Sequence, residues 1–116
     1  MTDNQKALIE NNPLSVATTD NKNPNLAIVA YALVIDDGHI LFTDKYLNKT
    51  VENLRINEKI CLATYDKDWN GLKICGTADY VTDGKYYERV KLQPENNKMP
   101  IRGAIIVNIE KIEEIG

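Results

Sequence analysis

The feature that most constrains the fold is a long apolar run that ends in a tight turn. Residues 26–35 are apolar at both alternating positions, so a strand made from them needs cover on both of its faces. The Asp-Asp-Gly sequence at 36–38 is typical of a hairpin turn in which Gly38 takes a positive φ, and 39–43 reads as the return strand. The sequence therefore predicts an antiparallel hairpin, with another subunit as one possible cover for its first strand.

Further strand patterns lie on both sides of this hairpin and are separated by short polar turns. The longest one contains Gly76, which predicts a bulge or a close backbone approach. We expect a mainly β fold, a six-stranded barrel with small flanking helices, because closure removes exposed sheet edges. The other predicted strands are 14–19, 60–65, 72–82 and 101–112; the predicted helices are 2–11, 49–57 and 85–92, and 93–100 is predicted to be a mobile polar loop.

Size and charge narrow the class of protein. At 116 residues and 13.1 kDa, the chain fits a single domain, residues 1–116. The net charge is −3 and the basic residues are scattered, which disfavours nucleic-acid binding, including an OB-like barrel for single strands. The longest apolar run has half the length of a membrane-spanning helix, and the first residues do not resemble a secretory signal. We expect a cytoplasmic protein that does not bind membranes.

The side chains offer no self-sufficient catalytic group. His39 is the only histidine and follows a turn, so a Ser-His-Asp or Cys-His relay is disfavoured. Cys61 and Cys75 lie among apolar neighbours without the spacing of a zinc site, which predicts two reduced core residues. No residue is therefore predicted to be catalytic, no metal is expected, and demanding chemistry would require an organic cofactor.

The start of the helix after the hairpin is a candidate anion site. Asn48 is the predicted N-cap, which places Lys49 and Thr50 in the first turn beside backbone N–H groups that lack partners within the helix. A phosphate there would meet these amides, the positive end of the helix dipole, a hydroxyl and an ammonium group. The alternative is an ordinary surface helix that happens to carry a lysine in its first turn.

Taken in order, these segments resemble the FMN-binding split-barrel family related to pyridoxamine 5′-phosphate oxidase. The resemblance extends over nearly the whole chain, and it depends on the order and spacing of several modest motifs. These motifs are Leu14–Thr19, the turn at 23–25, the Asp37-Gly38 hairpin, Asn48-Lys49-Thr50 with Glu52-Asn53-Leu54, Gly76-Thr77-Ala78 and the last strand.

The resemblance implies a homodimer of six-stranded split barrels with FMN in each of two clefts between the subunits. It assigns the FMN phosphate to Lys49 and Thr50, with Asn48 adjacent. It assigns the flavin ring to the strand at Ile28, Val29 and Ala30 and to the strand end at Thr43 and Asp44, and it makes Trp69, Lys73 and Ile74 candidates for reaching the ring from the other subunit. A lone tryptophan on a polar loop can equally be a lid over the core.

The function implied by this resemblance is that of an FMN-dependent oxidoreductase, with a small-molecule or protein redox partner that the sequence does not identify. The alternative is a non-catalytic carrier or sensor of flavin or haem with the same fold. The chain has only three arginines and no Arg-x-His near its end, which disfavours the vitamin-forming oxidase activity itself.

Overall fold

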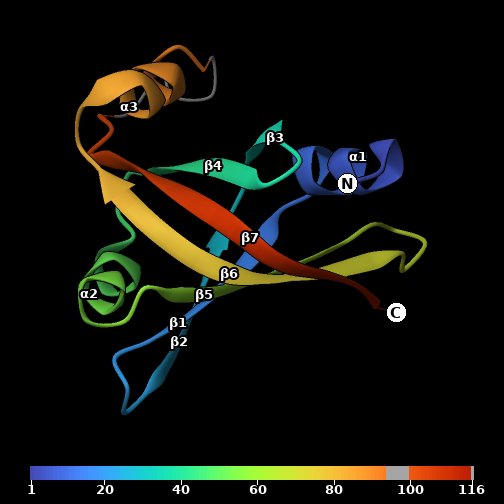
Figure 1. The fold of residues 1–116 in the computed structure, drawn as a ribbon, viewed down its shortest axis with the longest axis horizontal. Coiled ribbons are helices and arrows are strands. Elements are labelled where there is room, and N and C mark those ends of the chain that lie inside the picture. Colours follow the sequence, from blue (N-terminus) through green and yellow to red (C-terminus); the bar gives the residue numbers. More distant parts are fainter. Residues whose placement is uncertain (94–99, 116) are drawn as a thin grey trace.

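The computed structural model describes residues 1–93 and 100–115, which form one antiparallel sheet flanked by three helices (Figure 1). The predicted fold class, a mainly β split barrel, is confirmed, but the described part of the chain forms seven strands rather than six. Residues 94–99, most of the predicted mobile loop, lie outside the described residues. The elements are α1 (Asp3–Asn11), β1 (Leu14–Thr19), β2 (Pro24–Val29), β3 (Leu33–Asp36), β4 (His39–Asp44), α2 (Asn48–Ile56), β5 (Lys59–Tyr65), β6 (Gly71–Val81), α3 (Gly84–Lys91) and β7 (Gly103–Ile115).

The strand order explains why the sheet is a split barrel. The order is β2-β1-β5-β6-β7-β4-β3, so β2 and β3 are its two edges. These two strands are also consecutive in the chain, and the bend at 30–32 alone separates them. Four residue steps span at most about 14 Å, so the sheet must curl until its two edges lie close together at this bend.

The bend corrects the prediction of one continuous strand over 26–35. The inward parity changes across it, since Val29 of β2 and Val34 of β3 are both buried. The inward-facing residues have odd numbers in β2 and even numbers in β3. The segment 26–35 therefore looks apolar on both faces in the sequence, although each of its two strands has a distinct inner face. The described residues of the subunit also leave the outer face of β2 uncovered, because Leu26 and Ile28 on that face are 68% and 71% exposed.

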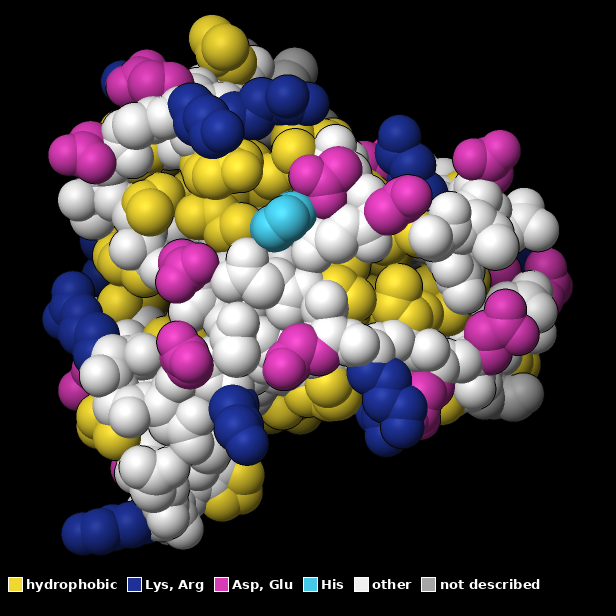
Figure 2. All heavy atoms as spheres, viewed as in Figure 1, with side chains coloured by type: hydrophobic (Ala, Val, Ile, Leu, Met, Phe, Trp, Pro, Cys, Tyr) yellow, Lys and Arg dark blue, Asp and Glu magenta, His cyan; other side chains and the backbone are white. Residues whose placement is uncertain are grey.

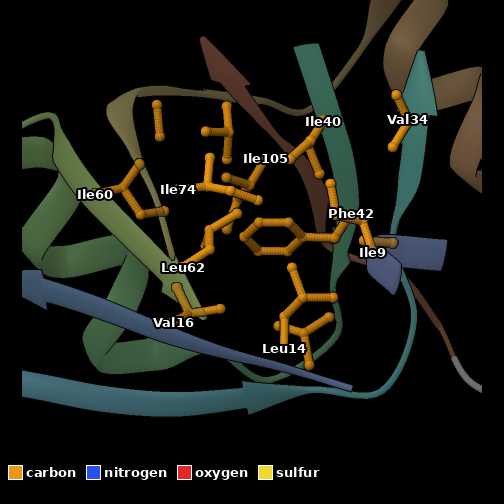
Figure 3. Close-up of a cluster of buried hydrophobic side chains, with 14 of the residues drawn as sticks. Ile9, Leu14, Val16, Val34, Ile40, Phe42, Ile60, Leu62, Ile74 and Ile105 are labelled. Atoms are coloured by element: carbon orange, nitrogen blue, oxygen red, sulfur yellow. The ribbon is translucent and has the colours of Figure 1, made fainter. Parts of the chain in front are cut away.

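Phe42 of β4 lies at the centre of the barrel core (Figure 3). Side chains from β1, β5, β6 and β7 surround its ring, and α1 contributes the fully buried Ile9. The helix α1 begins where predicted, because Thr2 and Gln5 form a reciprocal capping box. A second, smaller cluster lies under α3 and consists of Leu41, Val90, Ala104 and Ile106.

The turn at 36–38 forms for a different reason from the one predicted. The hairpin is present, but Gly38 does not have a positive φ. Instead, the Asp36 Oδ1 atom accepts a hydrogen bond from the Gly38 N–H at 2.8 Å and contacts Nδ1 of His39 at 2.7 Å. The histidine contact and then the Gly38 N–H lower the pKa of the Asp36 carboxyl. Side-chain hydrogen bonding, rather than glycine flexibility, makes this turn.

The surface bears out part of the charge analysis. Lys and Arg side chains are scattered among Asp and Glu on the face shown in Figure 2, and they do not form one basic patch there. Within the described residues, no helix has the length and apolar character needed to cross a membrane. The prediction that both cysteines are core residues is wrong, because Cys61 and Cys75 lie on the outer face of the sheet and are only partly buried.

Candidate functional site

The start of α2 is close to the predicted anion site, but its capping differs. Leu47, not Asn48, is the N-cap, and no side chain caps the helix. The Asn48 Oδ1 atom instead accepts a hydrogen bond from Nη1 of Arg102 at 2.6 Å. Because this side chain is turned toward Arg102, no side-chain cap engages the first backbone N–H groups of α2.

Asp44 anchors the loop that leads into α2. Its side chain is 1% exposed, and Oδ1 accepts hydrogen bonds from the Leu47 N–H at 2.8 Å and from Nη2 of Arg102 at 2.9 Å. The hydroxyl of Tyr80 donates to Oδ2 at 2.6 Å. Asp44, Arg102 and Tyr80, together with Asn48, Val51, Glu52 and Arg55, line a cavity of about 380 Å³. The carboxylate of Asp44 therefore holds the α2 start in position.

The Tyr80 phenol gives this network a measurable pH dependence. Burial, followed by the hydrogen bond to Asp44, raises the pKa of Tyr80 from 10 to about 12. In the unfolded chain, Tyr80 loses its proton near pH 10, before the folded protein does. The contribution of the Tyr80 phenol to the free energy of unfolding is therefore complete below about pH 10 and is lost as the pH rises toward 12. We expect the urea midpoint to fall less between about pH 9 and about pH 11 in Tyr80→Phe than in the unaltered protein. Equal losses in both proteins would contradict this role of Tyr80.

Thr50 has a buried hydroxyl that lacks a partner. Its side chain is 1% exposed, and Oγ1 has no hydrogen-bond partner among the described residues. Asn53, one turn further along α2, donates from Nδ2 to Oγ1 of Thr18 at 3.1 Å, but its Oδ1 atom also lacks a partner. Buried polar groups are nearly always paired in folded proteins. An unpaired hydroxyl in the first turn of an uncapped helix therefore fits a ligand site.

Lys49, the residue before Thr50, supplies a positive charge at the start of α2. Its Nζ atom lies 3.6 Å from Oδ2 of Asp20, and half of the lysine side chain is exposed. The backbone N–H groups of Asn23 and Lys22 contribute more than Lys49 to lowering the pKa of Asp20, because the carboxylate is held mainly by its own turn. Lys49 therefore makes a weak ion pair at the surface and is able to reach an incoming anion.

The predicted ring-binding segment lies at an edge of the sheet. Ile28 points outward, Val29 points into the core, and Ala30 is exposed at the bend. Because β2 pairs only with β1 among the described strands, its other backbone edge has no strand neighbour. The contact of this segment with the pyrimidine edge of a flavin stays a prediction. Thr43 lies in β4, next to Asp44.

Trp69 does not cover the core. It is 70% exposed, has a φ of 66°, and stacks on Tyr65 with ring centroids 5.1 Å apart. Lys73 also faces outward and pairs with Glu113 at 3.4 Å. Ile74, in contrast, is fully buried, so its side chain does not reach the surface of the subunit.

The structure thus brings together some predicted residues and separates others. Asp44 and Asn48 line one cavity at the start of α2 and share Arg102 as a hydrogen-bond donor, and Lys49 and Thr50 follow Asn48 in the helix. Trp69 and Lys73, in contrast, lie on the outer face of the sheet, and Ile74 lies in the core. Tyr80 and Arg102, which hold Asp44, were not predicted from the sequence. Neither is close to Asp44 in the chain, and no local spacing signals their contact.

Comparisons with known proteins agree with this fold. The sequence matches the family model for pyridoxamine 5′-phosphate oxidase over residues 1–116. It is 28% identical over 120 residues to an uncharacterised protein of Methanocaldococcus jannaschii, which covers 97% of this chain and 78% of that protein.

Two solved structures are also similar. The structure of HupZ from Group A Streptococcus superposes with a TM-score of 0.91 at 29% identity, covering 99% of this chain and 94% of that chain. An FMN-binding protein from Syntrophomonas wolfei gives a TM-score of 0.82 at 22% identity, covering 96% and 83%. This second likeness shows the fold alone.

Proposed function

The chain belongs to the pyridoxamine 5′-phosphate oxidase family, and on that premise we propose that it is a flavoprotein that binds FMN at the start of α2 and along β2. The observation that carries the proposal is the unpaired hydroxyl of Thr50 in the first turn of an uncapped helix, with Lys49 beside it. The FMN-binding protein of similar fold supports the choice of ligand.

The residues at the start of α2 suit a phosphate. The first amides of the helix supply donors, Thr50 supplies a hydroxyl that no other described residue engages, and Lys49 supplies a charge. Asp44 stays out of this contact, because its carboxylate is occupied by Tyr80, Arg102 and the backbone. Its part is to orient the loop before the helix.

The edge strand β2 suits the flavin ring. It begins at Pro24, just after the turn that holds Asp20 close to Lys49, and it ends at Val29. At about 3.3 Å per residue, its six residues extend over roughly 20 Å. A ligand lying along β2 would therefore meet Lys49 near one end and the open edge of the strand near Ile28 at the other.

A second copy of the chain is the proposed cover for the outer face of this sheet. Leu26 and Ile28 project from it, and they align in register with Ala17 and Ser15 of β1. The face continues across β5 to the Tyr65–Trp69 stack. Small side chains let two sheets approach closely, and the same patch on both copies would make a twofold interface. The aromatic stack of one copy would then lie near the site of the other.

We propose that the FMN-loaded dimer is an oxidoreductase in a cytoplasmic setting, with a small-molecule or protein redox partner. When bound, the flavin would supply hydride or electron transfer at N5. The protein would bind the phosphate, cover the ring and exclude water from it. A carrier or sensor of flavin or haem is the alternative.

Two measurements test this proposal. Light scattering on eluted protein should give twice 13.1 kDa, whereas a clean monomer would contradict the shared cleft. The FMN-loaded protein should then oxidise NADH or NADPH faster than free FMN at equal concentration. Tight FMN binding without any such turnover, also with other reduced donors, would favour the carrier and contradict the enzyme.

A further inference from the structure

Two cysteines face each other on the outer surface of the sheet. Cys61 of β5 and Cys75 of β6 are direct partners in the antiparallel register, so their side chains point to the same face. Both are free and only partly buried. They are separated by thirteen residues in the chain, and nothing in the proposed FMN site uses them.

The register places this pair within reach of a covalent bridge. Directly opposed residues of antiparallel strands have Cα atoms about 4.5–5.5 Å apart. Disulfide-bonded cysteines have Cα atoms about 4.4–6.8 Å apart, so the two ranges overlap. The strand pairing is continuous from Lys59 to Tyr65, and the register shift in β6 comes only after Cys75. No strand needs to slip for the two sulfur atoms to meet.

Charged side chains surround the Cys61–Cys75 pair on the β6 and β7 side. Lys73 and Glu113 lie on the same face, and Lys111 is the register partner of Cys75 on β7. On the other side, Cys61 is next to the uncharged Ala17 of β1. Burial, followed by the contact with Cys75, raises the pKa of the Cys61 thiol to about 11. Most Cys61 is therefore protonated at neutral pH, and its exchange reactions are slow there.

We propose that Cys61 and Cys75 are an oxidation site that closes into a disulfide within one chain. The oxidant is a low-molecular-weight disulfide. One thiolate attacks it, which forms a mixed disulfide and releases one thiol. The second cysteine then loses its proton and attacks the sulfur of the first cysteine, which releases the second thiol and leaves an S–S bond between β5 and β6.

The test exposes the dilute protein, as isolated, to glutathione disulfide and follows its intact mass. The expected product is lighter by two hydrogen atoms, gives one peptide pair joining Cys61 to Cys75, and returns to the starting mass with a reductant. The matched controls, Cys61→Ser and Cys75→Ser, should each retain one glutathione. Wild-type protein that retains glutathione, that joins only to other chains, or that does not react up to about pH 9 would overturn the proposal.

The dependence of the reaction rate on pH and on protein concentration provides two further tests. The first shows whether Cys61 reacts in the surroundings described, and the second tests the disulfide separately from the proposed dimer. In Cys75→Ser, burial still raises the pKa of the Cys61 thiol, so its reaction rate should rise about tenfold per pH unit between about pH 7 and about pH 9, whereas a flat profile would contradict the surroundings described. A second copy on this face would cover the pair, so closure should slow at high protein concentration. Closure at an unchanged rate would contradict the dimer face and leave the disulfide supported.

Discussion

A Gly76→Ala variant is expected to lose about 3 kcal/mol or more of its free energy of unfolding. Gly76 lies at the register shift between β6 and β7, and a Cβ atom there would overlap the backbone carbonyl oxygen of Asn108. It would also lie 3.2 Å from the Glu110 nitrogen. Because these neighbours are backbone atoms of the sheet itself, no side chain can move aside to make room. Urea unfolding of both proteins measures the loss.

Gly38→Ala is the matched control for this prediction. Gly38 has an ordinary φ, and the nearest atom to an added Cβ would be Asp36 Oδ1 at 3.6 Å. We expect a change within about 1 kcal/mol at this position. Similar losses in the two variants would show that the bulge is not tightly packed and would contradict the described register.

The double variant Lys49→Gln, Thr50→Val is expected to weaken FMN binding tenfold or more. Each charge-assisted hydrogen bond contributes about 1.5–3 kcal/mol, and the variant removes a charge and a hydroxyl from the proposed phosphate site. Val has nearly the shape of Thr. Because the Thr50 hydroxyl is buried and has no partner in residues 1–93 and 100–115, its removal should maintain or raise the stability of the FMN-free protein. Titration of FMN fluorescence and urea unfolding give the two quantities.

Two controls make this result specific. Lys6→Gln removes an equal charge from α1, outside the proposed site, and should leave FMN affinity unchanged. Asp20→Asn keeps the oxygen that accepts from Lys22 and Asn23 but removes the negative charge beside Lys49, so it should tighten FMN binding. Unchanged affinity in the double variant would contradict the assignment of the phosphate to α2.

Most strands could be predicted from the sequence because their signals are local. The strand at 14–19 and the bulge at Gly76 follow from alternation and from a glycine inside an apolar run, and both are confirmed. The division of 26–35 into β2 and β3 could not be predicted in the same way. It depends on the curl of the whole sheet, which brings two edge strands together at one bend.

In the candidate site, too, features with local sequence signals were predictable and features set by distant residues were not. The helix after the hairpin and its lysine and hydroxyl were predictable from a change of period near 47–54. The capping was not, because Asn48 bonds to Arg102, which lies 54 residues away. Asp44 was predicted as a ring contact, but the contacts described here show it holding the loop through Tyr80 and Arg102.

FMN binding by this chain is decided by the absorption spectrum of the freshly purified protein, before and after FMN is added. We expect a flavin spectrum, perturbed by binding, from a ligand whose released mass is that of FMN. A haem spectrum in place of the flavin bands would favour the carrier alternative. A colourless protein that leaves the spectrum of added FMN unchanged would contradict the proposal that this chain is a flavoprotein.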